Sequence, residues 1–164
     1  MFVSDNVDTA TPASVVWNRV DADIASSKDP TRFPSWIFID PANSHHAWIS
    51  YSGYNFNTPS QPGHVFSVTW DGVAGDFAVW TDISFNIWDI PITSVVFDPV
   101  TGDLYASSDF VVFRLAASNN PARQWFLAGL NMPMVETAGL TIIPGARVLY
   151  AATHGRGVWQ LTLP

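Results

Sequence analysis

The apolar residues of this chain fall into short runs that are rich in Val, Ile, Phe, Trp and Tyr. Gly, Pro, Asn and Asp bound these runs, which is typical of short β-strands joined by turns. The 3.6-residue spacing of an amphipathic helix is absent. The pattern predicts strands at 34–40, 47–51, 65–70, 77–83, 92–98, 104–108, 111–115, 123–127, 135–143, 148–153 and 157–161, preceded by strands at 2–4 and 14–20.

The strands repeat along the chain. A block of two strands with a proline-containing turn between them occurs at 38–50, 97–107 and 142–152. A tryptophan recurs out of phase with this block, at Trp17, Trp80 and Trp125, and the last two are 45 residues apart. A period of about 40–50 residues made of short strands predicts a β-propeller, in which four-stranded antiparallel sheets, the blades, repeat around an axis.

We therefore expect an all-β protein with one domain, residues 1–164, built from β-propeller blades of four-stranded antiparallel sheets. The expected units are a blade remnant at 1–20, blades at 33–83 and 91–127, and a last blade at 134–163 that strand 14–20 could close. Closed propellers have about four to eight blades, and a three-blade arc would expose sheet faces and edges. We expect either a piece of a longer propeller or a homo-oligomer that completes the ring, most simply a dimer with six blades.

Charge and composition narrow the choice of partners. The formal net charge of −7 argues against nucleic acid and anionic membranes. The absence of cysteine excludes disulfides, thiolate metal sites and a cysteine nucleophile. No apolar run is long enough to span a bilayer, and no signal peptide is visible. These features leave the location unknown, either cytoplasmic or, if the sequence is truncated, secreted.

Residues 149–159, Leu-Tyr-Ala-Ala-Thr-His-Gly-Arg-Gly-Val-Trp, resemble the last blade of sialidase-like β-propellers, also called BNR or Asp-box proteins. Xyloglucanase-type glycosidases and photosystem assembly-factor propellers look similar. The Asp-box of the family is roughly Ser-x-Asp-x-Gly-x-x-Trp, and Thr69, Asp71 and Gly72 before Trp80 follow it in degenerate form. The resemblance implies the propeller architecture for nearly the whole chain. It does not extend to the sialidase catalytic set of an arginine triad, Tyr, Glu and Asp.

Aligning the repeats brings candidate chemistry to one face of the predicted propeller. Asp109 and His154 occupy the same connection in successive blades, and Asp89 and Glu136 precede the inner strands. We predict His154, Glu136 and Asp89 as catalytic residues. Asp109, Asp89 and Glu136 offer the hard oxygen ligands that Ca²⁺ takes, so a calcium ion is the expected cofactor. The expected substrate-binding residues are Arg156, Tyr51, Tyr54 and Trp88.

Two mechanisms could use this set. A calcium ion could polarise a carbonyl while His154 acts as general base on a water, roughly as in propeller lactonases and esterases. Alternatively, Asp89 and Glu136 could act as a carboxylate pair on a glycosidic bond. We expect a hydrolase of a small ester, lactone or glycoside. The alternatives are a non-catalytic glycan-binding module, in which aromatic residues and the loop Gly53–Gly63 form the site, and a structural fragment of a larger glycosidase-like protein.

Overall fold

The computed structural model of the protein describes residues 1–21, 29–58 and 63–164. Within these residues the chain is all-β, with four antiparallel sheets of two to four strands. Two short 3₁₀ helices, Pro12–Ser14 and Pro144–Ala146, accompany the strands. No helix of the described part is long and apolar enough to cross a membrane.

The strands join their sheets in chain order. The first four-stranded sheet contains β3 (Phe33–Asp40), β4 (Asn43–Ser52), β5 (Val65–Thr69) and β6 (Val79–Asp82). The second contains β7 (Ile92–Phe97), β8 (Leu104–Ser108), β9 (Val112–Leu115) and β10 (Trp125–Leu127). The third has β11 (Thr137–Ile143), β12 (Val148–Thr153) and β13 (Val158–Thr162). A small hairpin pairs β1 (Phe2–Val3) with β2 (Asn18–Arg19).

The all-β class and the division into strands are confirmed, and most strand ends fall within a few residues of the predicted ones. The three larger sheets span residues 33–82, 92–127 and 137–162. Of the predicted strand 14–20, only Asn18 and Arg19 are in a strand, and they pair with β1. In this chain, therefore, the third sheet is not closed by that segment.

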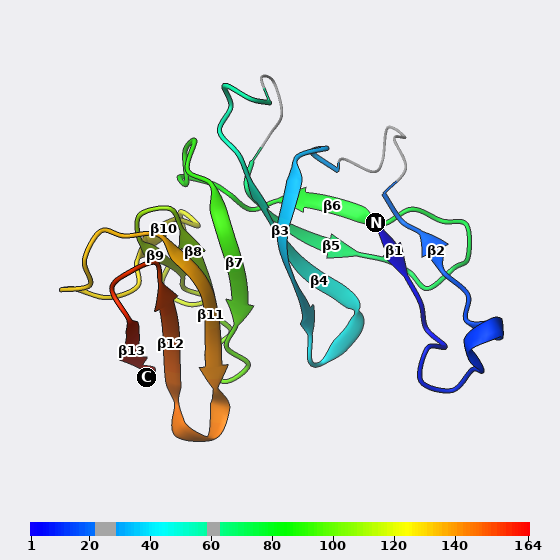
Figure 1. The fold of residues 1–164 in the computed structure, drawn as a ribbon. Coiled ribbons are helices and arrows are strands. Elements are labelled where there is room, and N and C mark those ends of the chain that lie inside the picture. Colours follow the sequence, from blue (N-terminus) through cyan, green and yellow to red (C-terminus); the bar gives the residue numbers. More distant parts are fainter. Residues whose placement is uncertain (22–28, 59–62) are drawn as a thin grey trace.

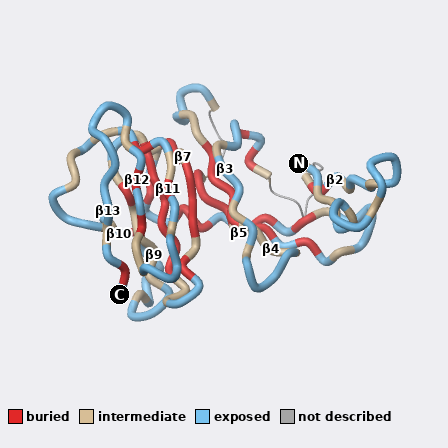
Figure 2. The backbone as a smooth tube through the Cα atoms, turned by 60° about the horizontal axis from the view of Figure 1, so that its bottom comes forward, coloured by how far each residue is buried: buried red, intermediate tan, exposed pale blue. Residues whose placement is uncertain are grey.

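The three larger sheets follow one another in an arc, with β7 packed against both β3 and β11 (Figure 1). Between the first and second sheets, the indole of Trp48 stacks on the ring of Phe97, with ring centroids 4.5 Å apart. Between the second and third sheets, Val96 and Tyr105 pack with Leu140, and all three are buried. Buried residues concentrate along the strands of the second sheet, which has a neighbour on each side (Figure 2).

An ion pair joins the β7–β8 turn to the β11–β12 hairpin. Arg147 donates from Nη1 to Asp98 Oδ1 at 2.7 Å and from Nη2 to Asp98 Oδ2 at 2.8 Å. The carboxylate also accepts from Thr101 Oγ1 at 2.8 Å and from the Val100 amide at 3.1 Å. The side chain of Asp98 is fully buried. The pair therefore ties the second sheet to the third at the end of the sheets where the chain passes from β7 to β8.

Candidate functional site

The predicted site residues lie on the connections β4–β5, β6–β7, β8–β9, β10–β11 and β12–β13. Because the strands are antiparallel and follow the chain order, these connections share one end of the sheets, which we call the rim. The β4–β5 and β6–β7 connections stand at the top of Figure 1. Residues 59–62 of the predicted specificity loop Gly53–Gly63 lie outside the described residues.

The β4–β5 connection holds two carboxylates from neighbouring connections. The hydroxyl of Tyr54 donates to Oδ2 of Asp109 at 3.0 Å. The amide of Asn55 donates to Oδ1 of Asp89 at 2.7 Å. Desolvation, followed by the hydrogen bond to Asp109, raises the pKa of Tyr54, so this phenol stays protonated and remains a donor. Two consecutive residues of the β4–β5 connection thus fix Asp89 and Asp109 on the rim.

Two buried nitrogen-bearing side chains support this part of the rim from below. Arg32 is 5% exposed; its Nη1 donates to the carbonyl of Gly53 at 2.6 Å and its Nη2 to the side-chain oxygen of Asn55. His64 is 2% exposed; its Nδ1 donates to the Tyr51 carbonyl at 3.2 Å, and its Nε2 lies 3.6 Å from Oδ1 of Asp89. The sequence analysis missed both residues, since nothing in a lone Arg or His shows that it folds under a loop.

Burial lowers the pKa of His64, which gives a pH-dependent stability. The unfolded chain binds a proton at this imidazole near pH 6.5, whereas the folded protein binds it only at lower pH, so acid favours unfolding. We expect the urea midpoint to fall between pH 7.5 and pH 5, and to fall less in His64→Gln. An equal fall in both proteins would contradict this, because His45, His46 and His154 are common to them.

The third sheet contributes a second pair to the rim. Nδ1 of His154 lies 3.4 Å from Oε2 of Glu136, and the amide of His154 donates to the Glu136 carbonyl at 2.9 Å. His154 is 82% and Glu136 48% exposed at the side chain. The amide of Val135 donates to the Phe110 carbonyl at 2.9 Å, which places this pair beside the β8–β9 connection that carries Asp109.

The predicted binding residues differ in how far they can reach a ligand. Trp88 is 84% exposed and precedes Asp89, and Tyr54 is 37% exposed. Arg156 is exposed at the β12–β13 turn, where its carbonyl accepts from the indole nitrogen of Trp159 at 3.1 Å. Tyr51 is only 2% exposed and packs against Phe66, with its hydroxyl donating to Asp29. Its ring belongs to the core because both faces of β4 are covered here, where Trp48 to Tyr51 are all buried, so it offers no face to a ligand.

The predicted calcium ligands fall into two groups. Tyr54 and Asn55 hold Asp109 and Asp89, whereas Glu136 pairs with His154. Among the described residues, no three or more His, Cys, Asp or Glu side chains come close enough together to hold a metal ion. Calcium takes six to eight oxygen ligands, so this arrangement does not fit the ion, and we derive no chemical step through it.

Comparison with known proteins assigns no function to the residues of the rim. No family model matches the chain. No curated protein sequence matches it significantly.

Proposed function

We propose that this protein is a hydrolase whose site lies on the rim and whose substrate is a small ester or lactone. The observation that carries the proposal is the line of contacts that runs across all three sheets. It passes from Asp89 to the Tyr54–Asn55 pair, then to Asp109, and through the Phe110–Val135 hydrogen bond to Glu136 and His154. Of the three residues predicted as catalytic, Glu136 and His154 thus lie side by side, and Asp89 lies at the other end of this line of contacts.

The proposed chemistry uses His154 as general base. Its imidazole removes a proton from a water molecule, whose oxygen attacks the carbonyl carbon. Glu136, beside the ring, stabilises the imidazolium that forms, and Arg156 stabilises the negative charge on the carbonyl oxygen. The carbon–oxygen bond then breaks, and His154 returns the proton to the leaving alkoxide. Because Glu136 pairs with His154 and Asp89 lies beside His64, this route fits the geometry better than a carboxylate pair acting on a glycoside.

We also propose that the three sheets are blades of a β-propeller and that copies of the chain complete the ring. The order of the sheets along the arc and the inner position of β3, β7 and β11 support this arrangement. Ile37 and Ile39, on β3, are 47% and 61% exposed. Apolar residues left in water on a sheet face favour association with another surface.

Turnover tests the proposed function directly. The purified protein is offered lactones, aryl esters and aryl glycosides, each with and without EDTA or added Ca²⁺. We expect His154→Ala and Glu136→Ala to lower the rate of ester or lactone hydrolysis by ~10²-fold or more, as loss of an acid–base group does. Asp76→Ala, at an exposed position away from the rim, serves as the control and keeps the wild-type rate. Equal rates in the wild type and the three variants would contradict the proposal. Loss of turnover in EDTA would show that the reaction requires a metal ion such as calcium.

Glycan binding without turnover is the second candidate, and the exposed aromatic side chains favour it. Trp88 and Phe56 are 84% and 94% exposed on two adjacent connections of the rim. Such rings can stack on sugar rings. Binding to a glycan array that is lost in Trp88→Ala, with no hydrolysis of any substrate, would establish this function in place of the first.

A further inference from the structure

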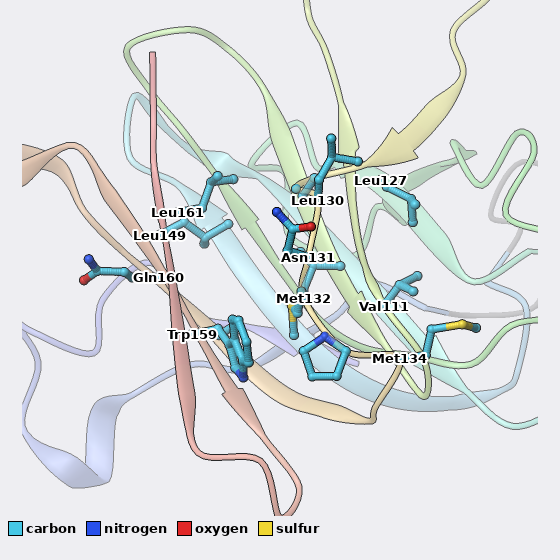
Figure 3. A pocket seen from close by; sticks show the side chains of 15 residues that line it. Val111, Leu127, Leu130, Asn131, Met132, Met134, Leu149, Trp159, Gln160 and Leu161 are labelled. Atoms are coloured by element: carbon cyan, nitrogen blue, oxygen red, sulfur yellow. The ribbon is translucent and has the colours of Figure 1, made fainter.

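A cavity of about 320 Å³ opens between the second and third sheets (Figure 3). Its volume lies at the small end of the range for ligand sites. The loop after β10 forms one wall and β13 forms the opposite wall. The residues that line the cavity include Leu127, Leu130, Met132, Met134, Trp159 and Leu161, and none of the lining residues is charged. The cavity therefore suits an apolar side chain.

The site of Trp125, between the first and second sheets, shows what an equivalent cavity holds when it is filled. The indole nitrogen of Trp125 donates to the Ile83 carbonyl at 2.8 Å. Asn86 brackets the backbone of Trp125: it accepts from the amide at 2.7 Å and donates to the carbonyl at 3.0 Å. Ile87 and Leu115 pack with the indole in the same apolar cluster.

The internal repeat gives each residue around Trp125 an equivalent at the cavity. The residues around Trp125 are Ile83, Asn86, Ile87, Phe113 and Leu115. Their equivalents, 45 or 46 residues further along, are Ala128, Asn131, Met132, Trp159 and Leu161. All five equivalents line the cavity. The cavity is thus a second copy of the Trp125 site without its tryptophan.

The strand that should bring this tryptophan is also missing from the third sheet. Trp125 lies on β10, which pairs with β9, and its partner in the ladder is Leu115. In the described part of the chain, β13 pairs only with β12, so the edge equivalent to that of β9 is open. An open edge presents unpaired amide and carbonyl groups that can accept another strand.

The geometry points to the strand around Trp17 of a second copy of this chain as the occupant. Trp17 takes the place of Trp80 and Trp125 in the sequence repeat, yet its side chain is 59% exposed. The segment 14–20 has one charged residue, Arg19, in a chain of net charge −7. It is therefore a suitable occupant for a cavity with no charged lining residue. The N-terminus lies at the opposite end of the arc from β13, which places the donor in another molecule (Figure 1).

In this arrangement the register follows from the second sheet. There Trp125 pairs with Leu115, and Phe126 pairs with Arg114. The equivalent pairs are Trp17 with Leu161 and Asn18 with Gln160. Trp17 then fills the cavity, the Ala128 carbonyl accepts from its indole, and Asn131 brackets its backbone. The β1–β2 ladder, which joins only two residues of each strand, is exchanged for a longer one on β13.

Engineered disulfides test this register without relying on hydrolysis. Asn18→Cys and Gln160→Cys are made in separate chains, which contain no other cysteine. Directly opposed residues of antiparallel strands lie within disulfide range. Mixing and oxidising the two variants should give a disulfide-linked heterodimer. The control pairs Asn18→Cys with Thr162→Cys, two residues out of register, and should link at least tenfold less.

Substitutions within the cavity and the strand supply a second readout. Trp17→Ala and Asn131→Ala change exposed residues, so each monomer should fold while self-association weakens tenfold or more by sedimentation. Free N-acetyltryptophanamide should compete with the cross-link. Equal cross-linking in both registers, a link within single chains only, or unchanged association in both variants would overturn the proposal. The inference rests on the proposed completion of the ring by copies of the chain, whereas hydrolytic activity has no part in these outcomes, so their failure is distinguishable from failure of the proposed hydrolase.

Discussion

Replacing Trp48 with alanine will lower the free energy of unfolding by about 3–5 kcal/mol, the usual cost of deleting a large aromatic side chain from a core. Trp48 is 6% exposed and fills the space between the first and second sheets. Its ring stacks on Phe97 and meets the edge of His46, with centroid distances of 4.5 and 4.4 Å. The substitution leaves a cavity at the junction of these two sheets, and the lost contacts with both rings add to the cost.

Urea denaturation and the midpoint of thermal unfolding measure this effect. For a chain of this length the loss corresponds to a decrease of roughly 6–20 °C in Tm. Trp88→Ala is the matched control, because it deletes the same side chain from a position that is 84% exposed. Its effect should stay within about 0.5 kcal/mol. Equal effects of the two substitutions would mean that the first two sheets do not share this core.

Replacing Asp98 with alanine will lower the free energy of unfolding by about 1–3 kcal/mol, because it removes a fully buried acceptor from the donors that pack against it. The substitution leaves Arg147, Thr101 and the Val100 amide without their shared acceptor. A surface carboxylate, Asp76, provides the control, since Asp76→Ala should change the free energy of unfolding by no more than about 0.5 kcal/mol. Chemical denaturation at pH 7 checks both values, and a small cost at Asp98 would show that the pair contributes little.

Acid should remove the contribution of Asp98 in a defined range of pH. The hydrogen bonds from Arg147 lower the pKa of this carboxyl to about 2. An aspartate in the unfolded chain has a pKa of about 3.9. The folded state therefore binds the proton less readily, and the stabilisation present above pH 4 is lost as the pH falls towards 2. The difference in stability between the wild type and Asp98→Asn should narrow over this range.

The strands could be predicted because the necessary information is local. The runs 104–108 and 148–153 are short, share the sequence Leu-Tyr-Ala, and lie 45 residues apart in the internal repeat. The structure confirms both as strands with the same bounds. The segment 14–20 was harder to assign, because its pairing partner depends on which surface it meets. Sequence gives the preference for an extended strand and leaves the partner open.

Prediction of the rim succeeded only in part, for the same reason. The alignment of repeats placed Glu136 and His154 together, and they lie 3.4 Å apart between Oε2 and Nδ1. It also placed Tyr51 among the exposed aromatics, although both faces of β4 are covered at this point and the ring lies in the core. The support from His64 and the pairing of Asp98 with Arg147 depend on contacts between distant segments. Neither has a spacing signal in the sequence.

In the described part of the chain, β7 of the second sheet packs against β3 of the first and β11 of the third. In such a linear array the stability is close to a sum of unit and junction contributions. A gene duplication that adds one 45-residue unit would therefore leave the existing junctions intact. Each added unit would also bring to the rim one more connection of the kind that carries Asp109 between β8 and β9 or His154 between β12 and β13. The architecture lets a lineage lengthen the array and enlarge its functional surface in one genetic step.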